Sequence, residues 1–235
     1  MSSGTSLQLI AMHGWCGDSR GWDPWLSLWQ QRGWQWCCGE RGYGSRPPLQ
    51  PDWPTAGRGR RVVIAHSLGP HLLPQAVLAA ADAVVLLTSF GRFVPEGRAG
   101  RPVRSALAGM AEQLAGPEPG AMLQSFLQQV AAPASAEALP ATPAAEPLSP
   151  QGLTRLSQDL ELIGQCAGLP PGFPPGARVL LLQAGADQIV VPEARRLLEQ
   201  ALPMADVLTL ASAGHGLIGT PTLALVTAWM EALEP

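Results

Sequence analysis

The stretch of sequence that decides the fold is Arg61-Val62-Val63-Ile64-Ala65-His66-Ser67-Leu68-Gly69. Its apolar, β-branched half is typical of a buried strand, and the small residues that follow predict a sharp turn into a helix. A serine on such a turn presents its hydroxyl above the sheet edge, beside the first backbone amides of the helix. A nucleophilic serine needs this arrangement, usually written Gly-x-Ser-x-Gly. Here Ala65 replaces the first glycine, and taken alone the stretch also fits an ordinary strand-to-helix connection.

An acid and a histidine follow two later strands. Asp187 and His215 each come just after an apolar run that is typical of a buried strand. Because parallel strands place their C-terminal ends at one edge of a sheet, we expect both residues to meet Ser67 there, in the chain order serine, acid, histidine. Asp206 is the competing acid, but it precedes its strand and is expected at the opposite edge. We therefore predict a catalytic triad of Ser67, Asp187 and His215.

The remaining apolar runs complete the expected sheet. Together they predict an α/β protein with a mostly parallel sheet of about six strands and helices on both faces. The helix after Ser67 should kink or end at Pro74, where the ring removes a backbone donor. The strands are expected near residues 7–12, 34–38, 61–66, 83–89, 178–184 and 206–210, with further helices near 22–31 and 221–233.

A different pattern fills residues 90–169, where helical segments are broken by proline and glycine. This stretch lies between two predicted core strands, so we expect an inserted helical lid on a core made of residues 1–89 and 170–235. Four arginines crowd the start of the lid, with Glu96 as their only acidic neighbour. A solvated face is the ordinary interpretation, and an anion-binding rim at the entrance is the one favoured by position. The arginines are Arg92, Arg98, Arg101 and Arg104.

The composition limits the classes of function. A chain of 235 residues suits one α/β domain with a large core. The net charge of −3, with arginine as every basic residue, gives no reason to expect a nucleic acid or a membrane as partner. The four cysteines show neither metal-ligand spacing nor a disulfide pattern, and no signal peptide is evident. We therefore expect a cytoplasmic monomer without a metal or cofactor.

Two further motifs strengthen a family resemblance that covers nearly the whole chain. Residues 7–15 end in His13-Gly14-Trp15, and residues 40–45 resemble an Asp-x-x-Gly-x-Gly-x-Ser turn in which Glu40 replaces the aspartate. With the triad pattern, these motifs resemble the α/β-hydrolase family. The resemblance implies that backbone amides of Trp15 and Leu68 form an oxyanion hole, and that Trp15 also contacts the substrate.

A narrower resemblance is to the esterases that cleave pimeloyl-acyl-carrier-protein methyl ester in biotin synthesis. It rests on His13-Gly14-Trp15, on Ser67-Leu68-Gly69 and on the lid segment 122–127. It implies a serine carboxylic ester hydrolase, with an acyl carrier protein as partner and the lid arginines holding its phosphopantetheine phosphate. Two alternatives stay open: a general esterase, thioesterase or C–C hydrolase for a small metabolite, and a non-catalytic binding protein on the same fold.

The other histidines and the tryptophans have simpler expected roles. We expect His13 to order its loop by hydrogen bonding and His71 to pack in the core. The side chain of His66 should point away from the triad, where it can line a pocket. Seven of the eight tryptophans lie before residue 54, and of these we assign only Trp15 to the pocket.

Overall fold

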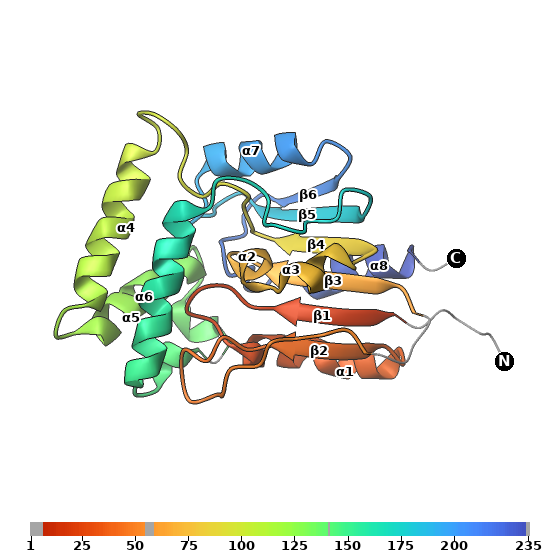
Figure 1. The fold of residues 1–235 in the computed structure, drawn as a ribbon, viewed down its shortest axis with the longest axis horizontal. Coiled ribbons are helices and arrows are strands. Elements are labelled where there is room, and N and C mark those ends of the chain that lie inside the picture. The colour runs from red at the N-terminus through yellow and green to blue at the C-terminus, as the bar shows by residue number, and fades with distance from the viewer. Residues whose placement is uncertain (1–6, 55–58, 141, 234–235) are drawn as a thin grey trace.

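The computed structural model describes residues 7–54, 59–140 and 142–233. Six strands form one sheet in the order β2-β1-β3-β4-β5-β6, and every neighbouring pair is parallel. All six C-terminal ends therefore lie at one edge, at the left in Figure 1. The prediction of a parallel sheet of about six strands is confirmed. The strands are β1 (Gln8–Met12), β2 (Gln35–Gly39), β3 (Arg61–His66), β4 (Ala83–Leu87), β5 (Arg178–Ala184) and β6 (Asp206–Leu210).

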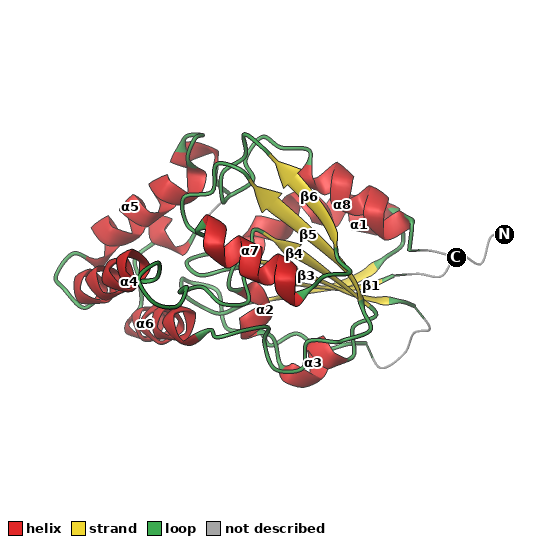
Figure 2. Ribbon diagram, turned by 90° about the horizontal axis from the view of Figure 1, so that it is seen from above, coloured by secondary structure: helices red, strands yellow, loops and turns green. Residues whose placement is uncertain are grey.

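Helices cover both faces of the sheet, as Figure 2 shows. One face carries α1 and α8, and the other carries α2, α3 and α7. Among the described residues, none of the helices is both long and apolar enough to cross a membrane. The bounds are α1 (Asp23–Gln31), α2 (Gly69–Leu72), α3 (Gln75–Ala79), α7 (Pro192–Ala201) and α8 (Thr222–Glu231).

The inner strands are buried on both sides, because successive side chains of a strand point to opposite faces. In β1, Leu9 and Ala11 join the core that includes side chains of α1 and α8. Ile10 and Met12 join the core that includes side chains of α3 and α7. This double burial explains why the inner strands have continuous apolar sequences, whereas β2 and β6 at the edges are more exposed.

Two helix predictions are refined by the structure. The segment near residue 22 begins as a 3-10 turn, η1 (Ser19–Trp22), in which the Asp18 side chain accepts a hydrogen bond from the Arg20 amide. The regular helix α1 starts only at Asp23. After Ser67, helix α2 ends at Leu72, and Pro74 separates it from α3, as its missing backbone donor predicts.

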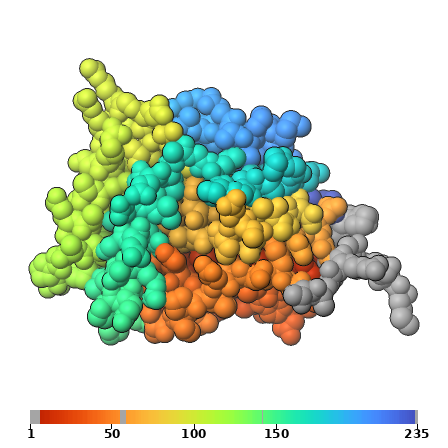
Figure 3. Space-filling model, in the orientation of Figure 1, coloured from red at the N-terminus to blue at the C-terminus, as the bar shows by residue number. Residues whose placement is uncertain are grey.

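Three longer helices gather beyond the C-terminal edge of the sheet (Figure 1). They are α4 (Arg101–Leu114), α5 (Pro119–Ala131) and α6 (Pro150–Gln165), with 3-10 turns η2 (Ala136–Ala138) and η3 (Pro143–Ala145) between α5 and α6. In Figure 3 this part of the chain covers the left end of the molecule. It lies within the predicted lid. The division of the chain at residues 90 and 169 stays a prediction, and the name lid is kept below for that segment.

Helix α6 is held against the core by a buried carboxylate. Asp159 is only 2% exposed, and it accepts hydrogen bonds from Arg41 Nε at 2.6 Å and Arg41 Nη2 at 2.8 Å. The Tyr43 hydroxyl donates a third bond to it at 2.6 Å. Nearby, Trp15 Nε1 donates to the Leu156 carbonyl at 2.9 Å. Side chains of the loops after β1 and β2 thus donate hydrogen bonds directly to α6.

We predict that Asp159→Ala lowers the free energy of unfolding by about 3 kcal/mol, because it leaves Arg41 and the Tyr43 hydroxyl without their acceptor. Urea denaturation measures the change. Glu161→Ala on the same helix is the matched control, since Glu161 is exposed and bonds only Gln165 among the described residues. This control should change stability by less than about 0.5 kcal/mol. Equal losses in the two variants would contradict the assignment of Asp159 as the anchor.

Candidate active site

Ser67 occupies a strained turn between β3 and α2. Its φ is 55°, in the left-handed region that residues other than glycine rarely adopt. Two neighbours hold this backbone: the Ser67 amide donates to the Leu87 carbonyl at 2.9 Å, and the Ser89 hydroxyl donates to the Ser67 carbonyl at 2.6 Å. Such strain costs about 1 to 3 kcal/mol and persists only where the surroundings enforce it.

Close backbone contacts explain which small residues the turn requires. A Cβ atom on Gly69 would lie 2.5 Å from the Met12 carbonyl oxygen, and one on Gly14 would lie 2.8 Å from Ser67 Cβ. Neither position has room for a side chain. Ala65, by contrast, is fully buried with its methyl group in the core. The second glycine of the usual pattern is therefore needed here, whereas the first can be alanine.

The structure brings Ser67, Asp187 and His215 into one hydrogen-bonded chain. His215 Nε2 lies 3.0 Å from Ser67 Oγ, and His215 Nδ1 lies 2.9 Å from Asp187 Oδ2. Asp187 Oδ1 also accepts from the amides of Ile189 and Val190, at 2.7 Å and 3.0 Å. Since a carboxylate only accepts, Nδ1 carries the proton, and in the neutral ring Nε2 is free to accept the serine proton.

The surroundings of Asp187 stabilise its negative charge. Burial alone would raise the pKa of Asp187, but the hydrogen bond and charge of His215 and the two backbone amides outweigh it and hold the pKa below its usual value. Its carboxylate is fully shielded from solvent. An ionised, buried carboxylate beside an imidazole can orient that ring and stabilise its protonated form.

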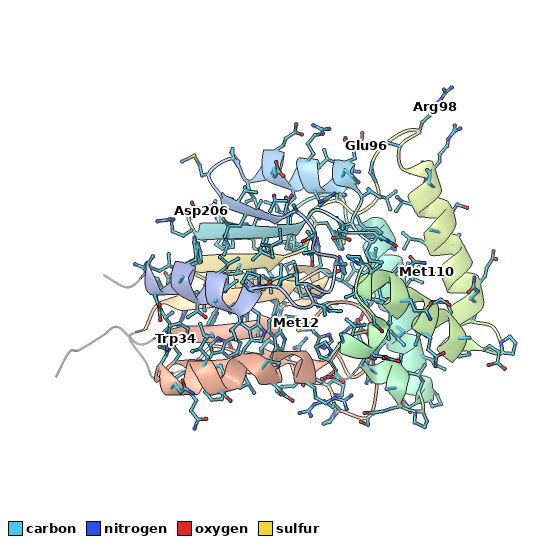
Figure 4. The ribbon with its side chains drawn as sticks, turned by 180° about the vertical axis from the view of Figure 1, so that it is seen from behind. Met12, Trp34, Glu96, Arg98, Met110 and Asp206 are labelled. Carbon is cyan, nitrogen blue, oxygen red and sulfur yellow. The ribbon has the colours of Figure 1, made fainter. Side chains whose placement is uncertain are left out.

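Asp206, the competing acid, lies at the other end of the strands. It begins β6, accepts from Trp229 Nε1 at 2.8 Å and pairs with Arg178 at 3.1 Å. Figure 4 shows it far from the strand ends that hold the triad. The expected edge assignment is confirmed.

The loop after β1 is ordered by His13, as expected. Its Nδ1 lies 2.8 Å from the Gly14 carbonyl oxygen, and its Nε2 accepts from the Arg41 amide at 3.1 Å. Within the described part of the chain, the backbone amides of Trp15 and Leu68 donate no hydrogen bond to another protein group. Both amides therefore keep a free donor, which an oxyanion hole requires, and this role stays a proposal.

The turn after β2 supports the same loop. Glu40 accepts from the amides of Ser19 and Gly42, at 2.9 Å and 2.8 Å, and lies 3.5 Å from His13 Nε2. Burial would raise the pKa of Glu40, but His13 and the two amides lower it to about 2. Glu40 therefore serves as the acceptor of this turn.

A cavity of about 370 Å³ lies next to the triad and is lined mainly by apolar groups. It contacts His215, Gly14 and Trp15, while Ser67 is not among its lining residues. The assignment of Trp15 alone was too narrow, because η1 and α1 also bring two further tryptophans, Trp22 and Trp25, to the wall. Its exposed lining residues, which mark the opening, include Pro24, Ala138, Pro140 and Gly219.

The lid arginines lie elsewhere. None of the four lines this cavity. Arg92 pairs with Glu96 at 3.2 Å, and Arg104 Nη2 donates to the Gly97 carbonyl at 2.9 Å, so both have local partners. Figure 4 shows Arg98 at the outer tip of the lid, pointing away from the molecule. Arg101 is exposed at the start of α4.

Two residues near the triad differ from the expectations. His66 was expected to point away from the triad, but its Nε2 lies 3.1 Å from the His215 carbonyl oxygen, and the two rings lie 5.0 Å apart. It does line the cavity. Thr88 was missed, and its hydroxyl donates to the same carbonyl at 3.0 Å. Its place directly after β4, at the edge that holds Asp187 and His215, was the available signal.

No protein-family model and no curated protein matches this chain. Solved structures match it along nearly its full length. A thermophilic esterase from Thermogutta terrifontis has 15% identity and a TM-score of 0.65, over 99% of this chain and 92% of that one. The bottromycin epimerase has 15% identity and a TM-score of 0.63, over 100% and 93%. An enol-lactonase from Burkholderia xenovorans has 14% identity and a TM-score of 0.63, over 99% and 92%.

Structural matches at such low sequence identity establish the fold and nothing more. Sheet order, helix placement and the structural matches agree, and the protein has the α/β-hydrolase fold. An esterase, an epimerase and a lactonase are among its structural neighbours, so the fold by itself does not decide the activity.

We predict that Gly69→Ala lowers the melting temperature by several degrees, because the new methyl group would overlap the Met12 carbonyl. The matched control is Gly109→Ala in α4, where the new Cβ atom would meet nothing within 4 Å. There alanine should stabilise the helix by about 0.5 to 1 kcal/mol. Differential scanning calorimetry compares the two variants. An unchanged melting temperature in Gly69→Ala would contradict the proposed close contact.

Proposed function

We propose that this protein is a serine carboxylic ester hydrolase whose nucleophile is Ser67. The observation that carries the proposal is the hydrogen-bonded chain from Ser67 through His215 to Asp187 at the C-terminal edge of the sheet. The strained turn adds weight, since backbone strain of this kind clusters at functional sites. Two free amides, of Trp15 and Leu68, lie on the loops beside the serine.

The geometry supports a two-step acyl transfer. Ser67 Oγ attacks the ester carbonyl while His215 Nε2 takes its proton, and the amides of Trp15 and Leu68 stabilise the negative oxygen that forms. His215 then donates the proton to the departing alcohol, which leaves an acyl-Ser67 ester. Water, activated by His215, cleaves that ester and restores the serine. Asp187 holds the imidazole and stabilises its positive charge in both steps.

The sequence resemblance supports a narrower substrate, the methyl ester of pimeloyl-acyl-carrier protein. In this proposal the exposed Arg98 and Arg101 contact an acidic carrier outside the cavity, and Arg92 and Arg104 support that surface through their local partners. A cytoplasmic monomer belongs to the same proposal. The location, though not the oligomeric state, is supported by the free cysteines among the described residues. General esters, thioesters and C–C bonds stay open as alternative substrates.

We predict that Ser67→Ala reduces hydrolysis of p-nitrophenyl butyrate by at least about a thousandfold, because the nucleophile is lost. Asp187→Asn should reduce kcat by about a thousandfold or more, because the asparagine amide favours the wrong imidazole tautomer. The matched control, Asp206→Asn, should leave kcat within about twofold. Steady-state kinetics with folding checked by circular dichroism measures all three. A larger loss for Asp206→Asn than for Asp187→Asn would reject the proposed triad.

We predict that Arg98→Ala with Arg101→Ala lowers kcat/KM for an acyl-carrier-protein methyl ester by about tenfold at low salt, through the loss of two exposed charge contacts. The difference should shrink in 0.5 M salt, where charges are screened. Hydrolysis of p-nitrophenyl butyrate should be unchanged. Arg32→Ala with Arg178→Ala is the matched control, since both residues are exposed and pair with Glu231 and Asp206. Equal losses with the control pair would reject a carrier surface on the lid.

A further inference from the structure

The cavity beside the triad carries no uncompensated charge. No arginine is among its described lining residues, and the chain contains no lysine. Asp18, the one carboxylate among the described lining residues, accepts hydrogen bonds from the amide and guanidinium of Arg20. The walls are mainly tryptophan, leucine and other apolar groups, so the cavity suits a mainly apolar, uncharged group.

One nitrogen near the triad stays open to this cavity. The His215 carbonyl can only accept, so its contact with His66 Nε2 at 3.1 Å places the proton of His66 on Nε2. Nδ1 of the neutral ring is then an acceptor. Among the described residues Nδ1 has no hydrogen-bond partner, and it is not one of the buried unpaired atoms. His66 is half-buried and lines the cavity, so its accessible Nδ1 belongs to a side chain that a bound molecule can reach.

The neutral form of His66 is favoured by its surroundings. Burial, and then the neighbouring His215, lower the pKa of His66 to about 4. At neutral pH the ring therefore keeps one donor, used on the His215 carbonyl, and one acceptor.

The position of Nδ1 limits where a matching donor can lie on a substrate. The position that a Cβ atom on Gly14 would take is 2.8 Å from Ser67 Cβ and 3.2 Å from His66 Nδ1. Ser67 Cβ and His66 Nδ1 therefore lie no more than about 6 Å apart. The attacked carbonyl carbon lies next to the serine oxygen, and a donor hydrogen-bonded to Nδ1 lies about 3 Å from that nitrogen. A donor bound to Nδ1 therefore lies in the neighbourhood of the attacked carbonyl, and the α- and β-carbons are the acyl positions nearest to that carbonyl.

We propose that His66 determines substrate specificity by accepting a hydrogen bond from a hydroxyl or N–H group on the α- or β-carbon of an otherwise apolar, uncharged acyl chain. This inference rests on the proposed ester hydrolase activity. The methyl end of a pimeloyl ester has no such donor, so the inference and the narrower substrate proposal predict different preferences.

Binding tests the inference apart from turnover. In the Ser67→Ala variant, the affinities of methyl octanoate, methyl 2-hydroxyoctanoate and methyl 3-hydroxyoctanoate are measured by fluorescence of the tryptophans that line the cavity. One hydroxy ester should bind about five- to tenfold more tightly than methyl octanoate, as expected for one added hydrogen bond. The same ratio should appear in kcat/KM of the wild-type protein.

Two replacements of His66 distinguish the roles of its two ring nitrogens. The amide of His66→Gln reaches the position of Nε2, so it keeps the donor to His215 and loses the acceptor. The amide oxygen of His66→Asn reaches only the position of Nδ1 and keeps that acceptor. The preference for the hydroxy ester should therefore fall to about onefold in His66→Gln and persist in His66→Asn. His71→Gln is the matched control and should keep the preference, because His71 bonds the Phe90 carbonyl and does not line the cavity.

Different results would overturn the role of His66, the placement of the donor and the proposed function. Equal binding of the three esters would overturn the role of His66, and so would a preference that survives His66→Gln. A preference confined to 2-hydroxyethyl octanoate, whose donor lies in the alcohol, would overturn the placement on the acyl chain. Selective binding without hydrolysis by the wild-type protein would instead reject the proposed function and leave the binding chemistry standing.

Discussion

The crowding of backbone around Ser67 is the constraint on which the rest of the site depends. The turn has to approach the loop after β1 so closely that Gly14 and Gly69 have no space for a Cβ atom. At this turn Ser67 keeps a left-handed conformation, and the bonds to the Leu87 carbonyl and from the Ser89 hydroxyl hold it there. Because main-chain contacts hold the Ser67 backbone, its side chain is not needed for orientation and the hydroxyl is free to bond His215, as the proposed nucleophilic role requires.

The sheet provides the second requirement, a common edge for residues distant in sequence. Ser67 and His215 are 148 residues apart, and they meet because parallel strands end on the same side. The His215 carbonyl is then fixed by His66 and Thr88, which follow or end neighbouring strands. The imidazole is therefore restrained at its backbone as well as at its ring. Such double restraint keeps a reacting group near its working geometry.

The sequence predicted the parts of this structure that depend on local pattern. The strands follow from apolar runs, the break before α3 follows from Pro74, and the placement of Asp206 follows from its position before a strand. His66 could not be placed in this way. A residue at the very end of a strand can turn toward either face of the edge, and its direction depends on the loop that contains His215, which only the tertiary structure reveals.

The same limit applies to the lid. Its helical character is visible in the sequence, but the ion pair between Arg41 and Asp159 joins residues 118 positions apart and leaves no local signature. The arginine cluster shows a related limit. The sequence places the four arginines close together, but only the structure shows that Arg92 and Arg104 bond groups in their own segment. Their role as a common surface stays a prediction.

The opening of the cavity has an evolutionary consequence. Its exposed residues, Pro24, Ala138, Pro140 and Gly219, come from three separate segments, and none of them bonds to Ser67, Asp187 or His215. Replacements at Pro24, Ala138 and Pro140 would change the shape of the opening at residues that lie in other segments than His215, whereas Gly219 shares the loop of His215 and has a φ of 65°. Changes in the molecules that are admitted can therefore arise in evolution separately from changes in the proposed reaction.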